Sequence, residues 1–332
     1  MTPPIGINGF GRIGRNYLRF ALEHGHEVAA INDITDTATL AHLLMYDSTY
    51  GRLDHQVEHD DAALVIDGRR LPVTSHRDPS DLDWGAHGAE IVIESTGRFR
   101  RRDDAAVHLK SGARKVIISA PGKDMDATIV MGVNEQSYDP VRHSVISNAS
   151  CTTNCVAPMA KVLHDAFGVA RGYMTTVHGY TNDQNLLDSP HKDLHRARSA
   201  AVNMIPTSTG AARSVGAVIP DLAGKFDGMA LRVPVEDGSL VDLACLLERP
   251  ATADEINQAF ADAAAGPMAG IIRYNTHPIV SRDVIGDASS CVFDAPLTQS
   301  SGDLVKIFGW YDNEWGYTCR LGDLIEHVSE ND

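Results

Sequence analysis

The feature that most restricts the fold of this chain is a glycine-spaced turn close to its start. A short apolar run around Ile7 precedes the turn Gly9–Gly14, and apolar positions at helical spacing follow it as far as Gly25. A second apolar run, Val28–Ile31, leads to Asp33. Strand, glycine turn, helix and strand in this order predict a βαβ unit with parallel strands, the arrangement that binds dinucleotides.

The three glycines of the turn are expected to have separate roles. Gly9 permits the tight turn, Gly11 lets the backbone approach a pyrophosphate, and Gly14 lets the helix pack closely on the strand. The start of the helix adds partial positive charge. Asp33, roughly twenty residues further on, is placed to bind ribose hydroxyls and to repel a 2′-phosphate. These features predict NAD as the cofactor; an ordinary βαβ turn with a surface aspartate is the alternative.

The remaining pattern indicates two domains. Short apolar runs alternate with helix-compatible sequence up to about residue 150, which predicts a doubly wound parallel sheet. After a helix expected over Cys151–Phe167, longer β-type runs with few helices predict an α+β domain. We therefore expect an α/β Rossmann dinucleotide-binding domain over residues 1–150 and an α+β catalytic domain with a mixed, largely antiparallel sheet over 151–315. A C-terminal helix, 316–332, is expected to pack back on the first domain.

The composition limits the partners and the location. The 332 residues suffice for two domains, and their hydrophobic (43%) and charged (22%) content is ordinary for a globular protein. A formal net charge of −15 disfavours a surface for nucleic acid or anionic membranes. No apolar run is long enough to span a bilayer, and the N-terminus has no signal-like pattern. We expect a cytoplasmic protein that binds neither nucleic acid nor a membrane.

The five cysteines give no sign of a disulfide framework, because their number is odd and the chain is large. Cys151 and Cys155 are four residues apart, a spacing that could place two metal ligands on one helix face. No second Cys or His pair at zinc-like spacing accompanies them. We therefore expect no metal site, and we ask instead whether these thiols are reactive.

Cys151 is the candidate nucleophile. It lies where a strand ending near Ser147 gives way to a helix. The positive end of the helix dipole and the unpaired backbone N–H groups favour a thiolate, and the same groups could hold an oxyanion. A nucleophilic cysteine also needs a base, and His178 ends the strand-like run Tyr173–Val177. Spacing alone does not bring the two side chains together, so a buried and inert Cys151 is the alternative.

Two further segments are candidates for binding anions. The run Thr207–Ala212 is rich in hydroxyl groups and opens a helix, as phosphate sites often do. Arg232 lies within an apolar strand, where it needs either an internal carboxylate or a ligand anion. Arg196 and Arg198 lie in a long polar segment, 179–203, and surface salt bridges account equally well for both.

Taken together, these segments resemble the phosphorylating glyceraldehyde-3-phosphate dehydrogenase family, from Ile5 to the last helix. The run Ser150–Cys155 with the downstream His178 is much more specific than the glycine turn. The matching blocks are Ile7–Arg15, Ser147–Cys155, His178–Gln184, Pro206–Ala212 and Trp310–Tyr317.

The resemblance implies a reaction and a set of roles. Cys151 would attack glyceraldehyde 3-phosphate with His178 as base, hydride would pass to NAD, and inorganic phosphate would cleave the thioester to give 1,3-bisphosphoglycerate. The family is homotetrameric, and the segment 179–203 resembles a loop that lines a neighbour's cofactor pocket. The implied substrate and phosphate residues are Ser150, Thr152, Thr181, Arg196, Thr209, Gly210 and Arg232. The implied cofactor residues are Gly9, Gly11, Arg12, Ile13, Asp33, Arg77, Ser119 and Asn313.

Three positions depart from the common pattern of the family. His195 stands where arginine is usual, in the phosphate region. Ser189 stands where NAD-specific members usually have leucine, near the adenosine pocket. Glu236 and Asp237 replace a more neutral turn, for which the sequence offers no explanation. The alternatives to the implied function are an erythrose-4-phosphate dehydrogenase and an NAD-binding redox sensor that uses Cys151 as an oxidation switch.

Overall fold

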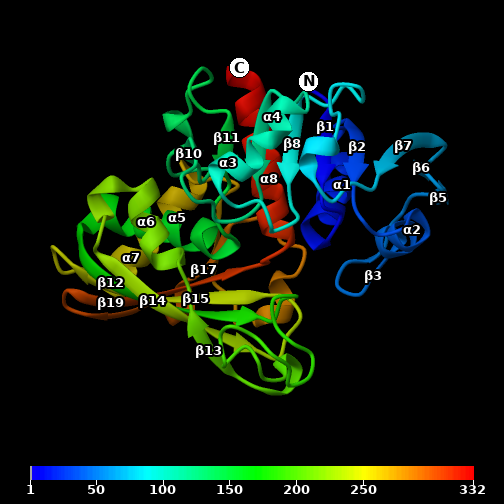
Figure 1. Cartoon of the computed structure of the whole chain (residues 1–332). Helices are drawn as coiled ribbons and strands as arrows, with labels where there is room; N and C mark the ends of the chain where they lie inside the picture. The colour runs from blue at the N-terminus through cyan, green and yellow to red at the C-terminus, as the bar shows by residue number, and fades with distance from the viewer. Residues whose placement is uncertain (1) are drawn as a thin grey trace. The chain divides into compact units, whose positions relative to one another are not determined.

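The computed structural model describes residues 2–332, and the chain forms two compact units (Figure 1). Unit 1 comprises Met1–Ile129, Glu135–Ala149 and Thr318–Asp332. Unit 2 comprises Val130–Asn134 and Ser150–Tyr317. Within residues 2–332 the structure contains no helix with the length and apolar character of a membrane span.

Unit 1 is built on a nine-stranded sheet in the order β10-β11-β9-β8-β1-β2-β7-β6-β5. Its centre is parallel, with β1 between β2 and β8, and the strand pairs outward to β10 are parallel as well. This confirms the predicted doubly wound sheet. The strands are β1 (Ile5–Asn8), β2 (Val28–Asn32), β5 (Val57–Asp60), β6 (Ala63–Ile66), β7 (Arg69–Thr74), β8 (Ile91–Glu94), β9 (Lys115–Ile118), β10 (Ala127–Thr128) and β11 (Val145–Ser147).

The helices of unit 1 include two short ones. These are α3 (Arg102–Ala105) and α4 (Val107–Lys110), which meet at Ala106. The other helices are α1 (Arg12–His24), α2 (Thr37–Met45) and the terminal α8 (Trp315–Asn331). Helix α8 packs on α1 so closely that a Cβ at Gly322 would lie 2.3 Å from the Phe20 ring.

The far edge of the sheet in unit 1 has no counterpart in the sequence analysis. β7 pairs with β2 in parallel, whereas β5, β6 and β7 pair with one another in antiparallel fashion. These strands are joined by the tight turns of a meander. A small antiparallel extension therefore completes the parallel sheet beyond β2.

Unit 2 contains an eight-stranded sheet in the order β13-β14-β12-β15-β19-β17-β16, with β18 paired to β19. β12 pairs in parallel with β14 and in antiparallel fashion with β15, so the predicted mixed, largely antiparallel sheet is confirmed. The strands are β12 (Val169–Gly179), β13 (Ile205–Ser208), β14 (Phe226–Val233), β15 (Ser239–Leu247), β16 (Ile272–Asn275), β17 (Cys291–Asp294), β18 (Gln299–Ser301) and β19 (Leu304–Tyr311).

Three helices cover one face of this second sheet (Figure 1). The central one, α5, spans Cys151–Phe167 as predicted, and its apolar residues enter the core of unit 2. α6 (Ala211–Val218) and α7 (Ala253–Ala265) pack on either side of it. The packing of α5 on β12, β15 and β19 fixes its first residue, Cys151, relative to the ends of those strands.

Candidate active site

The glycine turn of unit 1 has the geometry that dinucleotide binding requires. Gly9 has φ +95°, and a Cβ there would lie 2.7 Å from the backbone nitrogen of Thr96. A Cβ at Gly14 would lie 2.2 Å from the Gly9 carbonyl oxygen, so only glycine allows this contact between helix and strand. At Gly11, by contrast, a Cβ would meet nothing within 4 Å. The space beside the Gly11 backbone is therefore open to a pyrophosphate.

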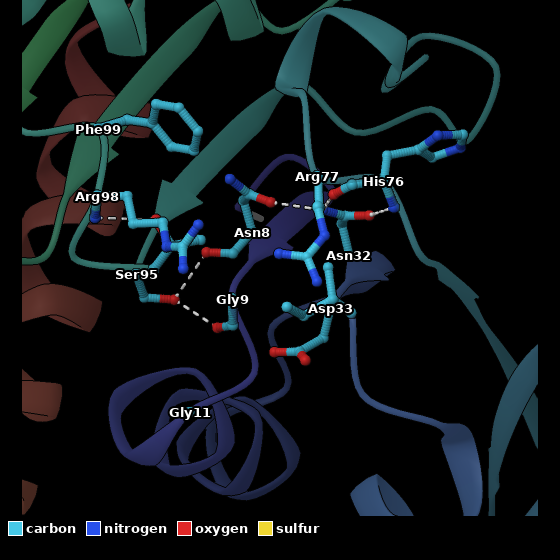
Figure 2. Close-up of a pocket in the computed structure, with 12 residues that line it drawn as sticks. Asn8, Gly9, Gly11, Asn32, Asp33, His76, Arg77, Ser95, Arg98 and Phe99 are labelled. Atoms are coloured by element: carbon cyan, nitrogen blue, oxygen red, sulfur yellow. Dashed lines mark hydrogen bonds between the residues drawn. The ribbon is translucent and has the colours of Figure 1, made fainter. Parts of the chain in front are cut away.

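Asp33 directly follows β2 and is held toward the turn without any ligand. Its Oδ2 accepts a hydrogen bond from the Phe10 backbone N–H (2.7 Å), and its Oδ1 accepts one from the Thr35 backbone N–H (2.9 Å). Figure 2 shows Asp33 and Arg77 on one side of the pocket and Ser95 on the other. Residues lining the pocket include the predicted Gly9, Gly11, Asp33 and Arg77, and also Asn32 and Ser95, to which the sequence analysis gave no role.

A buried polar network supports this pocket from within the unit. The Glu94 carboxylate, 1% exposed, accepts hydrogen bonds from the Asn8 side chain (2.6 Å) and from the N–H and hydroxyl of Thr96 (2.9 and 2.5 Å). His108 Nδ1 accepts from the Trp84 indole N–H (3.0 Å), so its Nε2–H donates to Glu94 (2.9 Å). The donors surround the one buried carboxylate and hold the ends of β1 and β8 in place.

The other predicted cofactor residues of unit 1 are placed less directly. The Arg12 guanidinium forms an ion pair with Asp47, whose side chain is buried, and lies over the Tyr50 ring. Ile13 is half-buried in the first turn of α1. Ser119 follows β9, where its backbone N–H donates to the Glu94 carbonyl (3.0 Å). None of these three lines the pocket at Gly11 and Asp33, and their cofactor roles stay predictions.

Unit 2 brings Cys151 and His178 together. Ser150 caps α5 by accepting a hydrogen bond from the Thr153 backbone N–H (3.0 Å), so Cys151 is the first residue of the helix. Near the end of β12, His178 is buried, and its Nε2 lies 3.5 Å from the Cys151 Sγ. Cys151 is half-buried and can therefore meet a substrate. This geometry fits a thiol with its base.

The contacts of His178 define its tautomer. Nδ1 lies 2.7 Å from the Gly179 carbonyl oxygen, which can only accept, so Nδ1 carries the proton and Nε2 presents a lone pair to the thiol. A terminal nitrogen of Arg232 lies 2.9 Å from the same carbonyl oxygen and 2.9 Å from Nδ1. A guanidinium can only donate, so Arg232 donates its hydrogen bond to the Gly179 carbonyl oxygen. Its positive charge then lies next to the edge of the imidazole ring.

These surroundings keep both reacting groups neutral. Burial and then the Arg232 charge lower the pKa of His178 to about 3. Burial raises the pKa of the Cys151 thiol to about 11, although Arg232 and hydrogen bonds with Thr152 act in the opposite direction. Burial thus acts against the thiolate that the helix N-terminus was expected to favour. The resting pair is a thiol and a neutral imidazole.

Arg232 has the surroundings of a ligand-binding cation. The sequence left two partners open, an internal carboxylate or a ligand anion. Among the described residues no carboxylate forms a salt bridge with Arg232, and its Nε is buried without a hydrogen-bond partner. Thr181 Oγ1, the other predicted substrate-phosphate contact, lies 3.5 Å from the same guanidinium. The structure thus favours a ligand anion at Arg232 and Thr181.

The second predicted anion site lies at the start of α6. Gly210 precedes the helix in open space, and Thr209 Oγ1 accepts a hydrogen bond from the Ala211 N–H (3.2 Å). Arg196 forms an ion pair with Asp183 and donates through Nε to Thr207 (2.9 Å), so its charge is already partly satisfied. His195, which departs from the family pattern, is exposed and lies 3.4 Å from Asp193.

Tyr311, at the end of β19, is a site residue that the sequence analysis missed. Its hydroxyl lies 2.8 Å from Thr152 Oγ1 and 2.9 Å from Thr176 Oγ1, and its ring meets the His178 ring edge-on. It therefore joins the start of α5, β12 and β19 beneath the reacting pair. The predicted phosphate contact Thr152 consequently has its hydroxyl engaged in the protein interior.

Asn313, the predicted nicotinamide contact, follows β19 and is 6% exposed. Its side-chain oxygen accepts a hydrogen bond from the Ser239 hydroxyl (2.6 Å), and Ser239 accepts one from the Gly179 N–H (3.2 Å). Ser239 was also missed, because a serine at the start of a strand gives no signal in a sequence. A chain of hydrogen bonds thus connects Asn313 to the residue after His178.

Metal ligands are not gathered in the part of the chain that the structure describes. No group of three or more His, Cys, Asp or Glu side chains there could hold an ion. Cys155 is fully buried and contacts Met159 (3.9 Å) and the Gly309 carbonyl (3.6 Å). The spacing of Cys151 and Cys155 is therefore not accompanied by further metal ligands among residues 2–332.

Comparison with known proteins gives a consistent result. The family model described as the NAD binding domain of glyceraldehyde 3-phosphate dehydrogenase matches residues 3–102, and the model of its C-terminal domain matches residues 150–313. The chain is 58% identical over 332 residues to glyceraldehyde-3-phosphate dehydrogenase of Streptomyces coelicolor. It is 57% identical to glyceraldehyde-3-phosphate dehydrogenase 2 of Streptomyces avermitilis and 56% identical to the Geobacillus stearothermophilus protein of that name, each over 331 residues. All three alignments cover 99% of both chains.

Proposed function

The chain belongs to the glyceraldehyde-3-phosphate dehydrogenase family, and on that premise we propose that it oxidises glyceraldehyde 3-phosphate to 1,3-bisphosphoglycerate with NAD and inorganic phosphate. The observation that carries the proposal is the reacting centre of unit 2. A thiol, its base and a cation without a carboxylate partner lie together there. A phosphorylated aldehyde is the kind of substrate that would engage all three groups.

In the first step the Cys151 Sγ attacks the aldehyde carbon while its proton passes to Nε2 of His178, and the imidazolium then gives this proton to the former carbonyl oxygen, which completes a thiohemiacetal. The Nε2 lone pair of the neutral imidazole faces the thiol and can take the proton as the S–C bond forms. The Nδ1 bond to the Gly179 carbonyl keeps the ring oriented throughout. Backbone N–H groups at the start of α5 would stabilise the developing oxyanion.

Substrate binding would itself strengthen the base. The Arg232 cation is one of the causes that lower the pKa of His178. A phosphate dianion held by Arg232 and Thr181 would offset that charge and raise the pKa of the imidazole toward a value suited to general base catalysis. Reactivity would then depend on the presence of the substrate phosphate, and Cys151 would stay a thiol in its absence.

NAD, held at Gly11 and Asp33 and oriented by Asn313, would accept the hydride when bound. The residues of the chain then complete the exchange: His178 accepts the hydroxyl proton, and a thioester is left on Cys151. Inorganic phosphate attacks the thioester carbon, and the pair of electrons of the broken C–S bond returns to the Cys151 sulfur. The open start of α6 at Thr209 and Gly210, with Ser150 and Arg196, is the proposed site for this phosphate.

We also propose a homotetramer in the cytoplasm. Several large apolar side chains in and just after the segment 179–203 are exposed, as is common at interfaces between subunits. Their exposed fractions range from 74% to 80%: Leu186, Leu187, Leu194, Val202 and Met204. Light scattering after gel filtration would give the mass directly, and a monomer at micromolar concentration would contradict the proposal.

The test of the function is NADH formation by the purified protein from glyceraldehyde 3-phosphate and NAD, with and without inorganic phosphate. Parallel reactions with erythrose 4-phosphate and with NADP test the substrate and the effect of Ser189. Phosphate-dependent turnover that prefers glyceraldehyde 3-phosphate is expected. Faster turnover of erythrose 4-phosphate would contradict the proposed substrate, and NAD binding without any turnover would favour the redox-sensor alternative.

A further inference from the structure

The carboxylate of Glu94 is the end point of a chain of side-chain hydrogen bonds beside the pocket of unit 1. Glu94 is the last residue of β8, and its side chain is 1% exposed. Its Oε1 accepts hydrogen bonds from the backbone N–H (2.9 Å) and the hydroxyl (2.5 Å) of Thr96. Its Oε2 accepts them from the Asn8 side chain (2.6 Å) and from His108 Nε2 (2.9 Å). Each oxygen of this buried carboxylate thus receives two donors.

The chain continues from Asn8 through Asn32 to the backbone of His76. The Asn32 oxygen accepts a hydrogen bond from the His76 N–H (2.9 Å), and its NH2 group donates to the His76 carbonyl (3.0 Å) and to Asn8 (2.8 Å). The two bonds to one stretch of backbone determine which end of the Asn32 amide faces Asn8. Figure 2 shows Asn8, Asn32 and His76 one after another along the pocket. Donation therefore runs in a single direction, from His76 to Glu94.

The direction of these bonds makes Glu94 an anion without a cationic neighbour in the chain. The Trp84 indole N–H can only donate, so it occupies Nδ1 of His108, and the imidazole proton lies on Nε2, toward Glu94. The Asn8 oxygen already accepts from Asn32, so the Asn8 NH2 group faces the carboxylate. A protonated carboxyl would bring a further donor into this set of donors. The hydrogen bonds therefore stabilise the ionised form of Glu94.

The residues that the chain holds are walls of the pocket. Four of its members line the pocket: Asn8, Asn32, His76 and Thr96. Two of these directly precede the predicted cofactor residues Asp33 and Arg77, which line the same pocket. Glu94 is not among the lining residues, so it acts on a ligand there through the groups that it orients.

We propose that Glu94 is a positioning residue for NAD, whose buried charge sets the direction of the hydrogen bonds through Asn8 and Asn32. The chain in turn holds the backbone next to Asp33 and Arg77, where the adenosine end of the cofactor binds. The inference rests on the proposed function only in assigning that end of NAD to this pocket. A residue that contacts no ligand atom thereby determines the affinity for the cofactor.

Glu94→Gln removes the charge at nearly constant size, and the new amide cannot satisfy the same four donors. An amide accepts hydrogen bonds at one end only. If its nitrogen faces Thr96, the Thr96 N–H loses its acceptor. If its nitrogen faces the other side, the donors on Asn8 and His108 lose theirs. An Asn8 amide that turned over to compensate would set its NH2 group against that of Asn32. Every arrangement therefore breaks a bond that holds a wall of the pocket.

The experiment measures the dissociation constants of NAD and of ADP-ribose by calorimetry on the full chain, without aldehyde or phosphate. Glu94→Gln should bind NAD about tenfold more weakly than the wild type, because a buried donor of the pocket wall loses its acceptor. The same factor is expected for ADP-ribose, which lacks the nicotinamide. Glu90→Gln is the matched control: it lies just before β8 and removes a partly exposed carboxylate that pairs with Arg114 (2.6 Å). It should bind both ligands as the wild type does.

A double substitution separates positioning from stability. When Asn8→Asp is combined with Glu94→Gln, the charge moves to position 8, where it can accept from Asn32 and from the new amide. The oxygen of that amide can then accept from Thr96, so the direction of the chain is restored. His108 exchanges an acceptor at 2.9 Å for one at 3.3 Å, away from the pocket. The double variant should therefore bind NAD within about threefold of the wild type, while its midpoint of thermal unfolding stays lower.

Three results would overturn the proposal. The first is a folded Glu94→Gln that binds NAD as the wild type does. The second is a folded double variant that binds NAD no better than Glu94→Gln, which would make the network purely structural. The third is a loss of affinity for NAD without a loss for ADP-ribose, which would place the effect at the nicotinamide.

If Glu94→Gln does not fold, the double variant decides the question alone. NAD binding within about threefold of the wild type then supports the proposal, and weaker binding contradicts it. Every measurement is made without an aldehyde. A protein that shows the expected affinities but does not oxidise glyceraldehyde 3-phosphate would therefore refute the proposed function and leave this inference standing.

Discussion

The pocket of unit 1 and the reacting centre of unit 2 are built in different ways. In unit 1 the pocket comes from backbone and from a carboxylate, Glu94, that neutral donors surround. In unit 2 the reacting groups come from α5, β12, β14 and β19, and for several of them burial disfavours the charged form. Among residues 2–332 no carboxylate forms a salt bridge with Arg232, and burial and the Arg232 charge lower the pKa of His178 to about 3.

This difference separates a binding pocket whose buried carboxylate is hydrogen-bonded at both oxygens from a reacting centre that holds an unpaired charge. The pocket of unit 1 is present without a ligand, and Asp33 is already held toward the glycine turn there. The reacting centre holds a cation and a base whose ionisation is disfavoured until a phosphate arrives. A buried charge that lacks a protein partner lowers the free energy of unfolding of the ligand-free protein and becomes binding energy for a ligand of opposite charge.

Cys151→Ser is the sharpest test that catalysis depends on the reacting centre of unit 2 and NAD binding on the pocket of unit 1. A serine hydroxyl is a far weaker nucleophile than the thiol, so kcat/KM should fall by at least about 10³-fold, while the affinity for NAD stays unchanged. Cys155→Ser, one helical turn further into the core, is the matched control and should keep its activity despite some loss of stability. Equal loss of activity in both variants would show that Cys151 acts through packing and not as the nucleophile.

Substitutions at two glycines of the turn test the roles given to them in the pocket of unit 1. In Gly9→Ala the new Cβ would lie 2.7 Å from backbone at φ +95°, so the free energy of unfolding should fall by about 3 kcal/mol or more. Gly11→Ala meets nothing within 4 Å, so its stability should change by less than about 1 kcal/mol, while NAD binds at least about tenfold more weakly. Urea unfolding and NAD titration check both. Loss of stability in Gly11→Ala would mean that the open space belongs to the fold and not to the ligand.

The glycine turn was predictable because its determinants lie within one short stretch of chain and act through sterics. The parallel sheet around it and the start of α5 at Cys151 follow from equally local patterns. The reacting centre was predictable only as a set of separate candidates. That His178 Nε2 reaches Cys151, that Arg232 touches the imidazole and that Tyr311 lies beneath them depend on the register of β12, β14 and β19.

Electrostatics was the least accessible property. The helix N-terminus predicted a thiolate at Cys151, whereas burial, which the sequence does not display, raises the pKa of the thiol to about 11. Asp237 looked like an unexplained turn residue, because the Asn313 backbone N–H that donates to it is distant in the sequence and reaches it only when β15 pairs with β19. Antiparallel strands β5–β7 escaped prediction for a similar reason, since their pairing with one another and with β2 is not displayed by the sequence.

Arg232→Met tests whether the buried charge in the reacting centre of unit 2 lowers the free energy of unfolding. Removal of the cation should lower kcat/KM by about 100-fold, mainly through KM, because the substrate phosphate loses its charged partner. The free energy of unfolding of the ligand-free protein should stay the same or rise by about 1 kcal/mol, because a buried charge without a carboxylate partner is gone. Arg273→Met, which removes a surface ion pair with Asp287 in the same unit, is the control and should leave both quantities nearly unchanged. A less stable Arg232→Met with unaltered KM would make Arg232 a structural residue.

The smallest expected effect is on the pH dependence of the free energy of unfolding, and it isolates the contribution of His178. Its native pKa of about 3 lies below the ordinary value of 6.5, so between these values the unfolded chain binds a proton that the native state refuses. The contribution is fully present above pH 6.5 and is lost as the pH falls, by about 2 kcal/mol between pH 6.5 and 5. Urea unfolding at pH 7.5, 6 and 5 should therefore show a steeper decline for the wild type than for His178→Gln. A control, His59→Gln, changes an exposed histidine of unit 1 and should decline as the wild type does. If all three proteins lose stability in parallel, the imidazole is not held neutral by burial and Arg232, and the proposed activation of His178 by the substrate phosphate loses its basis.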